Sequence, residues 1–447
     1  MSAPMLLTDL YQLTMLQGYW HEGLAGEAVF ELFVRKLPTE RNFLIAAGLE
    51  QALEYLEHLV LTDEEADYLR STGLFDDRFV DWLREIRFEG DVDAMPEGTV
   101  FFPNEPILRV TASIHQAQLV ETRLINLLQF QTMIASKAAR CVLAAPGRTL
   151  VEFGLRRAHG AEAGLLAARA TCAVGFTGTS NVLAGQRYGL PIFGTMAHSY
   201  VMAHDNELDA FLSFARSQPN NVVLLIDTYD TLLAVAKVIE AARILEREGI
   251  RIRAVRIDAG DLGELSKEVR RRLDAAGLES IGIFVSGDLD EWKLRSLIQQ
   301  EAPIGGFGVG TRLVTSHDAP YLNCAYKLEE YAGLARRKVS PGKQTYPGRK
   351  QVFRRYDDEG KMAGDTLAVA DEELPGEPLL VPVMRAGKRV GPVESLEAIR
   401  RRTREQLERL PEVYRRLEPA AQSFPLALSD RLQVLIVETD RRLGLAR

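Results

Sequence analysis

Apolar positions near the start of the chain follow first a helical period and then a strand period. Large apolar residues at positions 10, 13, 16 and 20 predict a helix over residues 8–20, with Thr8 as its N-cap and Asp9 in its first turn. A run of mostly apolar residues over 28–34 predicts a strand. The chain is therefore expected to begin with mixed helix and strand.

The same mixture continues over the next eighty residues. Leucine or valine at positions 49, 53, 56 and 60 predicts a second amphipathic helix, and Thr62 with Glu65 forms the capping-box pattern that begins a third. Prolines and glycines divide residues 92–111 into short strand-like pieces. We therefore predict an α+β domain with an antiparallel sheet over residues 1–115.

A different rhythm begins at residue 116. A long helical pattern over 116–145 leads into seven short apolar pieces, each followed by a helical or polar segment. These pieces are residues 150–153, 173–176, 192–194, 222–226, 254–257, 281–285 and 304–309. Strands that alternate with helices form parallel sheets. The pattern predicts an α/β fold with an irregular parallel (β/α) barrel over residues 116–325.

Polar clusters directly follow all seven predicted strands. They are GLRR at 154–157, TGTS at 177–180, GTMAH at 194–198, DTYD at 227–230, DAGD at 258–261, SGD at 286–288 and GVGT at 308–311. Because the carboxyl ends of parallel strands share one rim of a barrel, we expect these clusters to surround a single active-site mouth.

The pattern changes again in the last part of the chain. Basic strand-like pieces and Pro-Gly turns precede a loop over 371–378, a charged helix over 395–417 and a final helix near 428–443. We expect residues 326–447 to pack partly with the N-terminal domain. The additional α+β domain would then be built from both ends of the chain.

Composition limits the classes of function. The 447 residues are 46% hydrophobic and 26% charged, and the net charge of −8 argues against a nucleic-acid partner. The longest aliphatic run, 222–226, is far short of a membrane span, and the first residues do not resemble a secretory signal. The three cysteines are widely separated, which suits a reducing compartment and provides neither a disulfide framework nor a zinc site. We expect a cytoplasmic protein without a membrane partner or a protein metal site.

The segment GGFGVGT at 305–311 is a candidate phosphate site. Glycines let backbone amides approach a phosphate, and the Thr311 hydroxyl can donate a further hydrogen bond. The third glycine comes too early for the dinucleotide fingerprint. Glycines at strand ends also occur for steric reasons, so both interpretations of Gly308 and Gly310 stay open.

Charged residues at the 254–257 strand suggest a second candidate site. Arg256 and Asp258 are two residues apart and therefore face the same side of the strand. If that side lines the barrel, a buried Arg256 needs an anion from the protein or from a substrate. Asp258 and Asp261 can hold ribose hydroxyls or a magnesium–pyrophosphate group, although Asp261 suits a helix N-cap equally well.

Three other candidates are ambiguous by themselves. His198 follows Thr195 near a predicted helix start, where a lone histidine is more often structural than catalytic. Tyr11 suits a core or an interface, and Arg156 suits a solvated surface. Residue type alone does not separate these interpretations.

Seven ordered segments nevertheless resemble the nicotinate phosphoribosyltransferase family across nearly the whole chain. They are LTDLYQ at 7–12, FVRKLP at 33–38, EFGLRR at 152–157, SNVLAG at 180–185, GTMAHS at 194–199, RIDAGDL at 256–262 and GVGT at 308–311. Several motifs in register are far more specific than any one of them.

The resemblance implies a role for each candidate. In a nicotinate pocket of Tyr11, Thr195 and Arg256, the tyrosine stacks on the pyridine and the arginine pairs with the carboxylate. ATP phosphorylates His198, which acts with Arg256 and Asp258 in catalysis. Residues implied to bind phosphoribosyl pyrophosphate are Thr311, Gly310, Gly308, Gly287, Asp261 and Arg156, the last of which reaches a neighbouring subunit's site.

The resemblance also implies ATP and Mg2+ as cofactors and a homodimer with shared active sites. The enzyme would be an ATP-dependent ligase that forms nicotinate mononucleotide for NAD biosynthesis. Many bacterial relatives have glutamate after the phosphorylated histidine, where this chain has Ser199, but other branches also carry serine. Some relatives hold a structural metal with a cysteine cluster that this chain lacks.

Other functions remain to be distinguished. A quinolinate phosphoribosyltransferase would need cations for two carboxylates and no ATP site, and nicotinamide has no carboxylate for Arg256. A non-catalytic homologue that senses a nucleotide is the alternative from another class. The joint presence of Tyr11, Thr195, His198, Arg256 and Thr311 favours turnover.

Overall fold

The chain is divided into two compact units. The computed structural model describes residues 4–445, and the outermost residues of the predicted terminal segments, 1–3 and 446–447, lie outside the described residues. Unit 1 combines the chain up to Ser136 with the chain from Ala319 onward, and unit 2 is Lys137–Asp318. The helix α6 (Glu121–Ala144) begins in unit 1 and ends in unit 2. The bounds 1–115 and 116–325 for the two predicted domains, and 326–447 for the C-terminal segment, stay a prediction.

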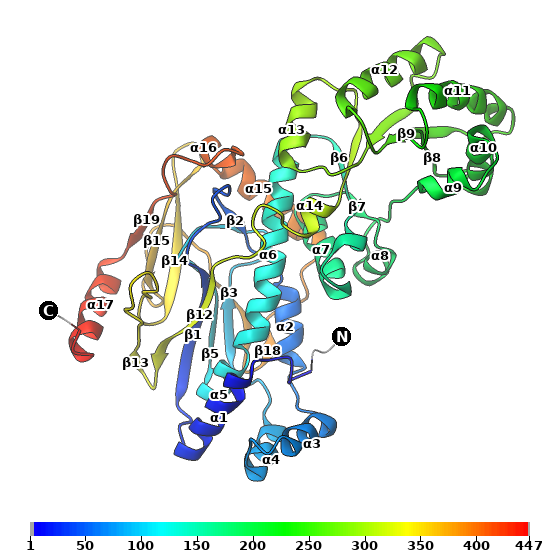
Figure 1. Cartoon of the computed structure of the whole chain (residues 1–447). Helices are drawn as coiled ribbons and strands as arrows, with labels where there is room; N and C mark the ends of the chain where they lie inside the picture. The colour runs from blue at the N-terminus through cyan, green and yellow to red at the C-terminus, as the bar shows by residue number, and fades with distance from the viewer. Residues whose placement is uncertain (1–3, 446–447) are drawn as a thin grey trace. The chain divides into compact units, whose positions relative to one another are not determined.

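Unit 1 contains a sheet of seven strands drawn from both ends of the chain. The central strand β1 (Glu27–Val34) pairs antiparallel with β12 (Cys324–Tyr331) on one side and β5 (Pro106–Ser113) on the other, as Figure 1 shows in blue, yellow and cyan. The outer strands are β13 (Leu334–Ala335), β3 (Asp91–Ala94), β17 (Val381–Arg385) and β18 (Lys388–Arg389), in the order β13-β12-β1-β5-β3-β17-β18. The predicted α+β domain from the two chain ends is therefore confirmed.

The remaining elements of unit 1 are a second sheet, a two-stranded ribbon and the surrounding helices. The second sheet has the order β16-β14-β15-β19, from Glu377–Pro378, Lys350–Tyr356, Met362–Val369 and Leu426–Leu428. The ribbon joins β2 (Leu44–Ile45) and β4 (Val100–Phe101). The helices are α1 (Leu10–Glu22), α2 (Leu49–Glu57), α3 (Asp63–Ser71), α4 (Asp77–Glu85), α5 (Ile114–Leu119), α15 (Leu396–Arg409), α16 (Glu412–Arg415) and α17 (Asp430–Arg442).

Unit 2 is built on six parallel strands. Their order is β7-β6-β11-β10-β9-β8, and they comprise Gly178–Thr179, Thr149–Glu152, Gly306–Val309, Gly282–Val285, Ile252–Ile257 and Val222–Leu225. The sheet curls but does not close, because β7 and β8 lie at its two edges and do not pair with each other; it is a half-barrel. The prediction of an irregular parallel barrel is confirmed in this form.

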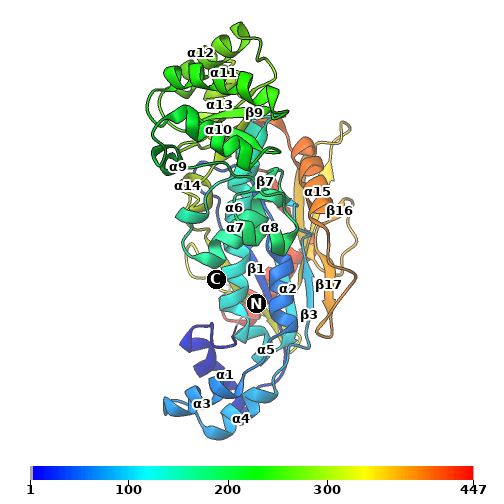
Figure 2. The ribbon, with the colours of Figure 1, turned by 90° about the vertical axis from the view of Figure 1, so that its right-hand side faces the viewer.

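Helices follow the strands of unit 2 as the alternating pattern predicts. They are the short η1 (Leu155–Arg157), α7 (Ala161–Ala173), α8 (Val182–Tyr188), α9 (His198–Met202), α10 (Glu207–Ser217), α11 (Thr231–Arg247), α12 (Leu262–Ala275), α13 (Glu291–Gln299) and α14 (Thr311–Val314). Figure 2 shows the green helices α10 to α13 grouped around β9. Each long helix lays an apolar stripe on the sheet, such as Val235 and Val238 of α11, both fully buried.

Four expectations about local structure were wrong in detail. Asp9, not Thr8, is the N-cap of α1. Residues 173–176 include the end of α7 and not a strand, and only Ile192 of 192–194 forms a bridge, to Thr179. The helix predicted over 395–417 is broken into α15 and α16, because Pro411 cannot continue α15.

Candidate active site

The carboxyl ends of the strands in unit 2 bring most of the predicted site residues to one edge. Neighbouring strands β8, β9, β10 and β11 are followed by Asp227, Asp258, Gly287 and Gly310. The next strand in the sheet, β6, is followed by Gly154 and by η1, which carries Arg156. The expected convergence of polar clusters is therefore present for these strands.

Arg256 is largely buried at this edge and incompletely paired. Its Nη1 donates to the Thr195 hydroxyl at 2.6 Å, while its Nε is buried and has no hydrogen-bond partner. Burial lowers the pKa of the Arg256 guanidinium; the carboxylates of Asp258 and Asp227 oppose this shift, and Arg156 adds to it. A buried N–H without an acceptor costs about 1–3 kcal/mol, so the site favours an anion that can accept from it.

An apolar cavity of about 440 Å³ is lined by Thr195 but not by Arg256. Its walls include Phe153, Phe284 and the first residues of three strands, Thr149, Gly282 and Gly306, so it extends toward the amino ends of the strands. The two phenylalanine rings are 5.8 Å apart, centroid to centroid, and tilted by 46°. A cavity of this size with apolar walls and a few polar groups is typical of a small-molecule site.

Phe153 was not among the predicted site residues. It follows β6, where the buried carboxylate of Glu152 accepts hydrogen bonds from the Thr179 hydroxyl at 2.5 Å and from the Gly154 amide. Burial raises the pKa of Glu152, and these two hydrogen bonds lower it. The two hydrogen bonds that the Glu152 carboxylate accepts hold the turn that carries Phe153. The sequence contains no signal that distinguishes a phenylalanine lining a cavity from one in the hydrophobic core.

Asp258 is held by two neighbouring strand ends. Its backbone amide donates to Asp227 Oδ2 at 2.8 Å, and the Ser286 hydroxyl donates to its Oδ1. Gly287 has φ +102°, and a Cβ there would lie 2.0 Å from the Asp258 carbonyl oxygen. Only glycine therefore allows β10 to end this close to β9.

Asp261 is the N-cap of α12, as its alternative interpretation proposed. One carboxylate oxygen accepts from the amides of Gly263 and Glu264, both at 3.1 Å. Asp258, Asp261 and Gly287 also line a second cavity, of about 410 Å³, at this edge. A role of Asp261 toward a ligand stays a prediction.

The glycines that precede α14 are explained by close packing. A Cβ on Gly308 would lie 2.5 Å from the Phe153 ring, and one on Gly310 would lie 2.9 Å from the Phe153 carbonyl oxygen. The steric reason for these glycines is therefore present, and it does not exclude phosphate binding. Thr311 begins α14 and is exposed at the same edge, so its role as a phosphate ligand stays a prediction.

His198 is the first residue of α9, three residues after Thr195. Its Nδ1 lies 3.2 Å from the Thr228 hydroxyl oxygen. Thr228 adjoins Asp227, which contacts Asp258, so a short chain of contacts links the histidine to the Arg256 side of the site. Sequence reasoning named the DTYD cluster at 227–230 but did not single out Asp227 or Thr228.

Two predicted site residues, Arg156 and Tyr11, are exposed. Arg156 is exposed in η1 and acts on Arg256 electrostatically. Tyr11 lies on α1 of unit 1 and is 47% exposed. Burial, Glu121 and Asp9 raise the pKa of its phenol.

Residues 4–445 contain neither a metal-binding cluster nor a membrane-spanning helix. In the described range 4–445, no three His, Cys, Asp or Glu side chains are placed to hold a metal ion. No helix in that range is both long and apolar enough to cross a membrane.

The half-barrel and its site define a class of protein: an α/β barrel whose strand carboxyl ends carry clustered charged and polar side chains, an arrangement typical of enzymes. Comparison with known proteins gives the family. The chain matches the nicotinate phosphoribosyltransferase (NAPRTase) N-terminal domain over residues 6–129, the NAPRTase family over 149–334 and the NAPRTase C-terminal domain over 376–436. The chain belongs to the nicotinate phosphoribosyltransferase family.

Individual relatives agree with this assignment. The chain is 51% identical over 428 residues to nicotinate phosphoribosyltransferase pncB2 of Mycobacterium tuberculosis, covering 96% of this chain and 92% of that protein. It is 42% identical over 379 residues to the Bacillus subtilis nicotinate phosphoribosyltransferase, covering 83% and 77%. The crystal structure of human nicotinic acid phosphoribosyltransferase matches with a TM-score of 0.88 at 32% identity, covering 97% of this chain and 99% of that one.

Replacing Gly287 with alanine tests the packing at the Asp258 strand end. The added Cβ would collide with the Asp258 carbonyl, and a displacement of about 1 Å can lower turnover by roughly a hundredfold. Gly277→Ala is the matched control, because Gly277 also has a positive φ (+74°) but open space around its Cβ position. Steady-state rates of the family's transfer reaction should fall in the first variant only, and equal rates in both would contradict the account.

Proposed function

We propose that this chain transfers the phosphoribosyl group of phosphoribosyl pyrophosphate to nicotinate, forming nicotinate mononucleotide and pyrophosphate in NAD biosynthesis. The observation that carries the proposal is the largely buried Arg256, whose Nη1 donates to the hydroxyl of Thr195, a residue that also lines an apolar cavity. Nicotinate offers a carboxylate to a guanidinium and a flat ring to a cavity of this kind. The names of the relatives support the same acceptor.

The reaction requires positioning and charge stabilisation more than covalent chemistry by the protein. The C1–oxygen bond of the donor breaks through an oxocarbenium-like state, the pyridine nitrogen bonds to C1, and pyrophosphate leaves with the electron pair. Arg256 and Thr195 would orient the acceptor. Backbone amides near Gly310 and the Thr311 hydroxyl would bind phosphate oxygens of the donor.

Mg2+ fits the donor side of this site as an ion that arrives on the substrate. Magnesium takes one or two carboxylates together with substrate phosphates, and Asp258 presents such a carboxylate beside Asp227. When bound, the ion neutralises charge that develops on the leaving pyrophosphate. Asp258 would hold it while Arg256 holds the acceptor.

ATP is proposed to enter the cycle through His198. A ring nitrogen bonds to the γ-phosphorus, the bond between that phosphorus and the β–γ bridging oxygen breaks, and ADP leaves with the electron pair. Water later hydrolyses the phosphohistidine to free phosphate. A neutral imidazole has a ring nitrogen with a free lone pair, which can attack phosphorus. The enzyme would accordingly belong to the ATP-dependent ligases.

A homodimer with shared active sites is part of the proposal. Tyr11 belongs to unit 1, and its phenol is half-exposed together with its neighbours Leu7 and Leu10, 49% and 55% exposed. Exposed apolar side chains of this kind suit an interface. Tyr11 and Arg156 would complete the site of the neighbouring subunit in the cytoplasm.

Removing the Arg256 side chain should weaken selection of the acid. A charge-assisted hydrogen bond contributes roughly 1.5–3 kcal/mol, so Arg256→Ala should lower kcat/KM for nicotinate by about ten- to a hundredfold or more. The KM for phosphoribosyl pyrophosphate should change less. Arg251→Ala, an exposed arginine just before the same strand, is the control and should behave as wild type. An Arg256→Ala enzyme that still prefers nicotinate over nicotinamide to the original extent would refute the assignment.

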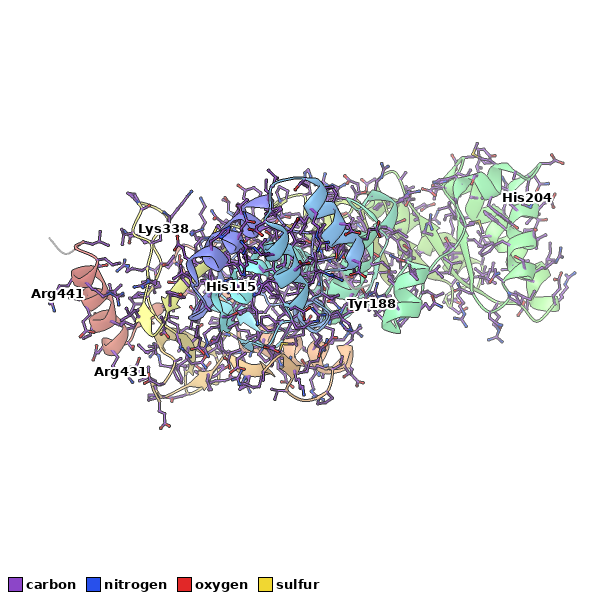
Figure 3. The ribbon with its side chains drawn as sticks, turned by 90° about the horizontal axis from the view of Figure 1, so that it is seen from below. His115, Tyr188, His204, Lys338, Arg431 and Arg441 are labelled. Atoms are coloured by element: carbon purple, nitrogen blue, oxygen red, sulfur yellow. The ribbon has the colours of Figure 1, made fainter. Side chains whose placement is uncertain are left out.

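Replacing His198 with asparagine should abolish ATP hydrolysis and ATP stimulation. A slow ATP-independent transfer should remain, since the acceptor and donor contacts are left intact. His204, labelled in Figure 3, gives the control His204→Asn, because its Nδ1 lies 2.8 Å from the Tyr200 carbonyl oxygen and its position is past the end of α9. The measurement is the amount of acid-labile label that the protein takes up from ATP labelled in its γ-phosphate, followed by peptide mapping to locate that label. Unchanged ATP stimulation in His198→Asn would exclude the phosphohistidine.

Mixing two impaired variants tests the shared site. Tyr11→Ala and His198→Ala chains, refolded or exchanged together, should regenerate part of the ATP-stimulated activity if the two residues meet across an interface. Each variant alone, treated identically, is the control. An active enzyme that sediments as a monomer would contradict the dimer.

A further inference from the structure

The dipeptide Asp227-Thr228 at the end of β8 contacts both halves of the site. Asp227 accepts the Asp258 backbone amide at 2.8 Å, and the Thr228 hydroxyl oxygen lies 3.2 Å from His198 Nδ1. No family motif used above includes Thr228. Among residues 4–445, no other hydrogen bond reaches the His198 ring.

The turn that carries Thr228 is anchored on both sides. On its N-terminal side Asp227 is tied to β9 through the Asp258 amide. On its C-terminal side Asp230 caps the 17-residue helix α11 by accepting the Leu233 amide at 2.8 Å. The Thr228 hydroxyl is therefore presented from a fixed position.

His198 is held far less firmly by its own element. Helix α9 has five residues, and its N-cap Ala197 makes no side-chain capping bond. The helix is tied to α10 by the hydrogen bond from the Tyr200 hydroxyl to Ser213, at 3.1 Å. That contact holds the backbone of α9 but leaves the His198 imidazole free to turn about its χ2 torsion.

We propose that Thr228 is a positioning residue that fixes the His198 imidazole through Nδ1, so that the ring is presented to ATP in one orientation. The hydroxyl can donate to Nδ1 or accept from it, and in either case the hydrogen bond leaves Nε2 free to face the phosphate. A ring held in this way reacts more often in the right geometry. This inference rests on the proposed phosphorylation of His198.

The test compares three variants with the wild type. The quantity measured is the rate at which the protein takes up acid-labile label from ATP labelled in its γ-phosphate. Thr228→Val keeps the shape and removes the hydroxyl, and should slow labelling by roughly three- to tenfold, the effect of one neutral hydrogen bond. Thr228→Ser should restore most of the rate. Ser213→Ala, which removes the other tether of α9, should label at the wild-type rate. ATP-independent transfer, and its KM for nicotinate, should be unchanged in all three.

Several outcomes would overturn the inference. Wild-type labelling by Thr228→Val would show that the hydroxyl is not needed, and an equal loss of ATP-independent transfer would show a merely structural role. A wild type that takes up no label would instead refute the proposed phosphorylation. The 15N spectrum of the histidine rings without ATP gives an independent readout: the His198 Nδ1 signal should shift in Thr228→Val, which lacks the hydrogen bond at that nitrogen. Identical spectra would contradict the inference whatever the labelling shows.

Discussion

The hydrogen bond between Arg256 and Thr195 is the contact on which the proposed acceptor site depends. It fixes one side of a guanidinium that the fold has largely buried, while the buried Nε on the other side has no hydrogen-bond partner. Asp258 and Asp227 offset part of the cost of burial without contacting that Nε. An arginine that is largely buried among carboxylates at the carboxyl edge of a parallel sheet is a candidate partner for an anionic ligand.

The parallel half-barrel brings the other groups within reach of this arginine. Strand ends can meet closely only where side chains are absent, and glycines occupy those positions at 287, 308 and 310. The same close approach places the Phe153 ring against β11 and gives the cavity an apolar wall. Close strand packing and ligand binding are therefore not competing explanations of these glycines, because the packing is what shapes the pocket.

Much of this arrangement could be predicted from the sequence, for physical reasons that differ between residues. The two-residue spacing of Arg256 and Asp258 predicts that their side chains face the same side of the strand. The capping box that the sequence predicts at Thr62 and Glu65 is present with both of its hydrogen bonds. Short apolar runs were less informative, since residues 173–176 are apolar in a buried helix end just as they would be in a strand. Asp227 and Thr228 were missed as individuals, because a polar residue at a strand end has a role only through a partner distant in sequence. The ligand roles of Tyr11, Arg156, Asp261 and Thr311 remain predictions that depend on groups outside unit 2 or on substrates.

The acceptor preference of the unmodified enzyme tests the central claim most directly. Product formation from phosphoribosyl pyrophosphate should be measured with nicotinate, nicotinamide and quinolinate, each with and without ATP and Mg2+. The account predicts nicotinate mononucleotide as the product, with kcat/KM for nicotinate at least about tenfold above that for nicotinamide, as one charge-assisted hydrogen bond requires. It also predicts stimulation by ATP. Equal use of nicotinamide, or turnover of quinolinate in place of nicotinate, would contradict it.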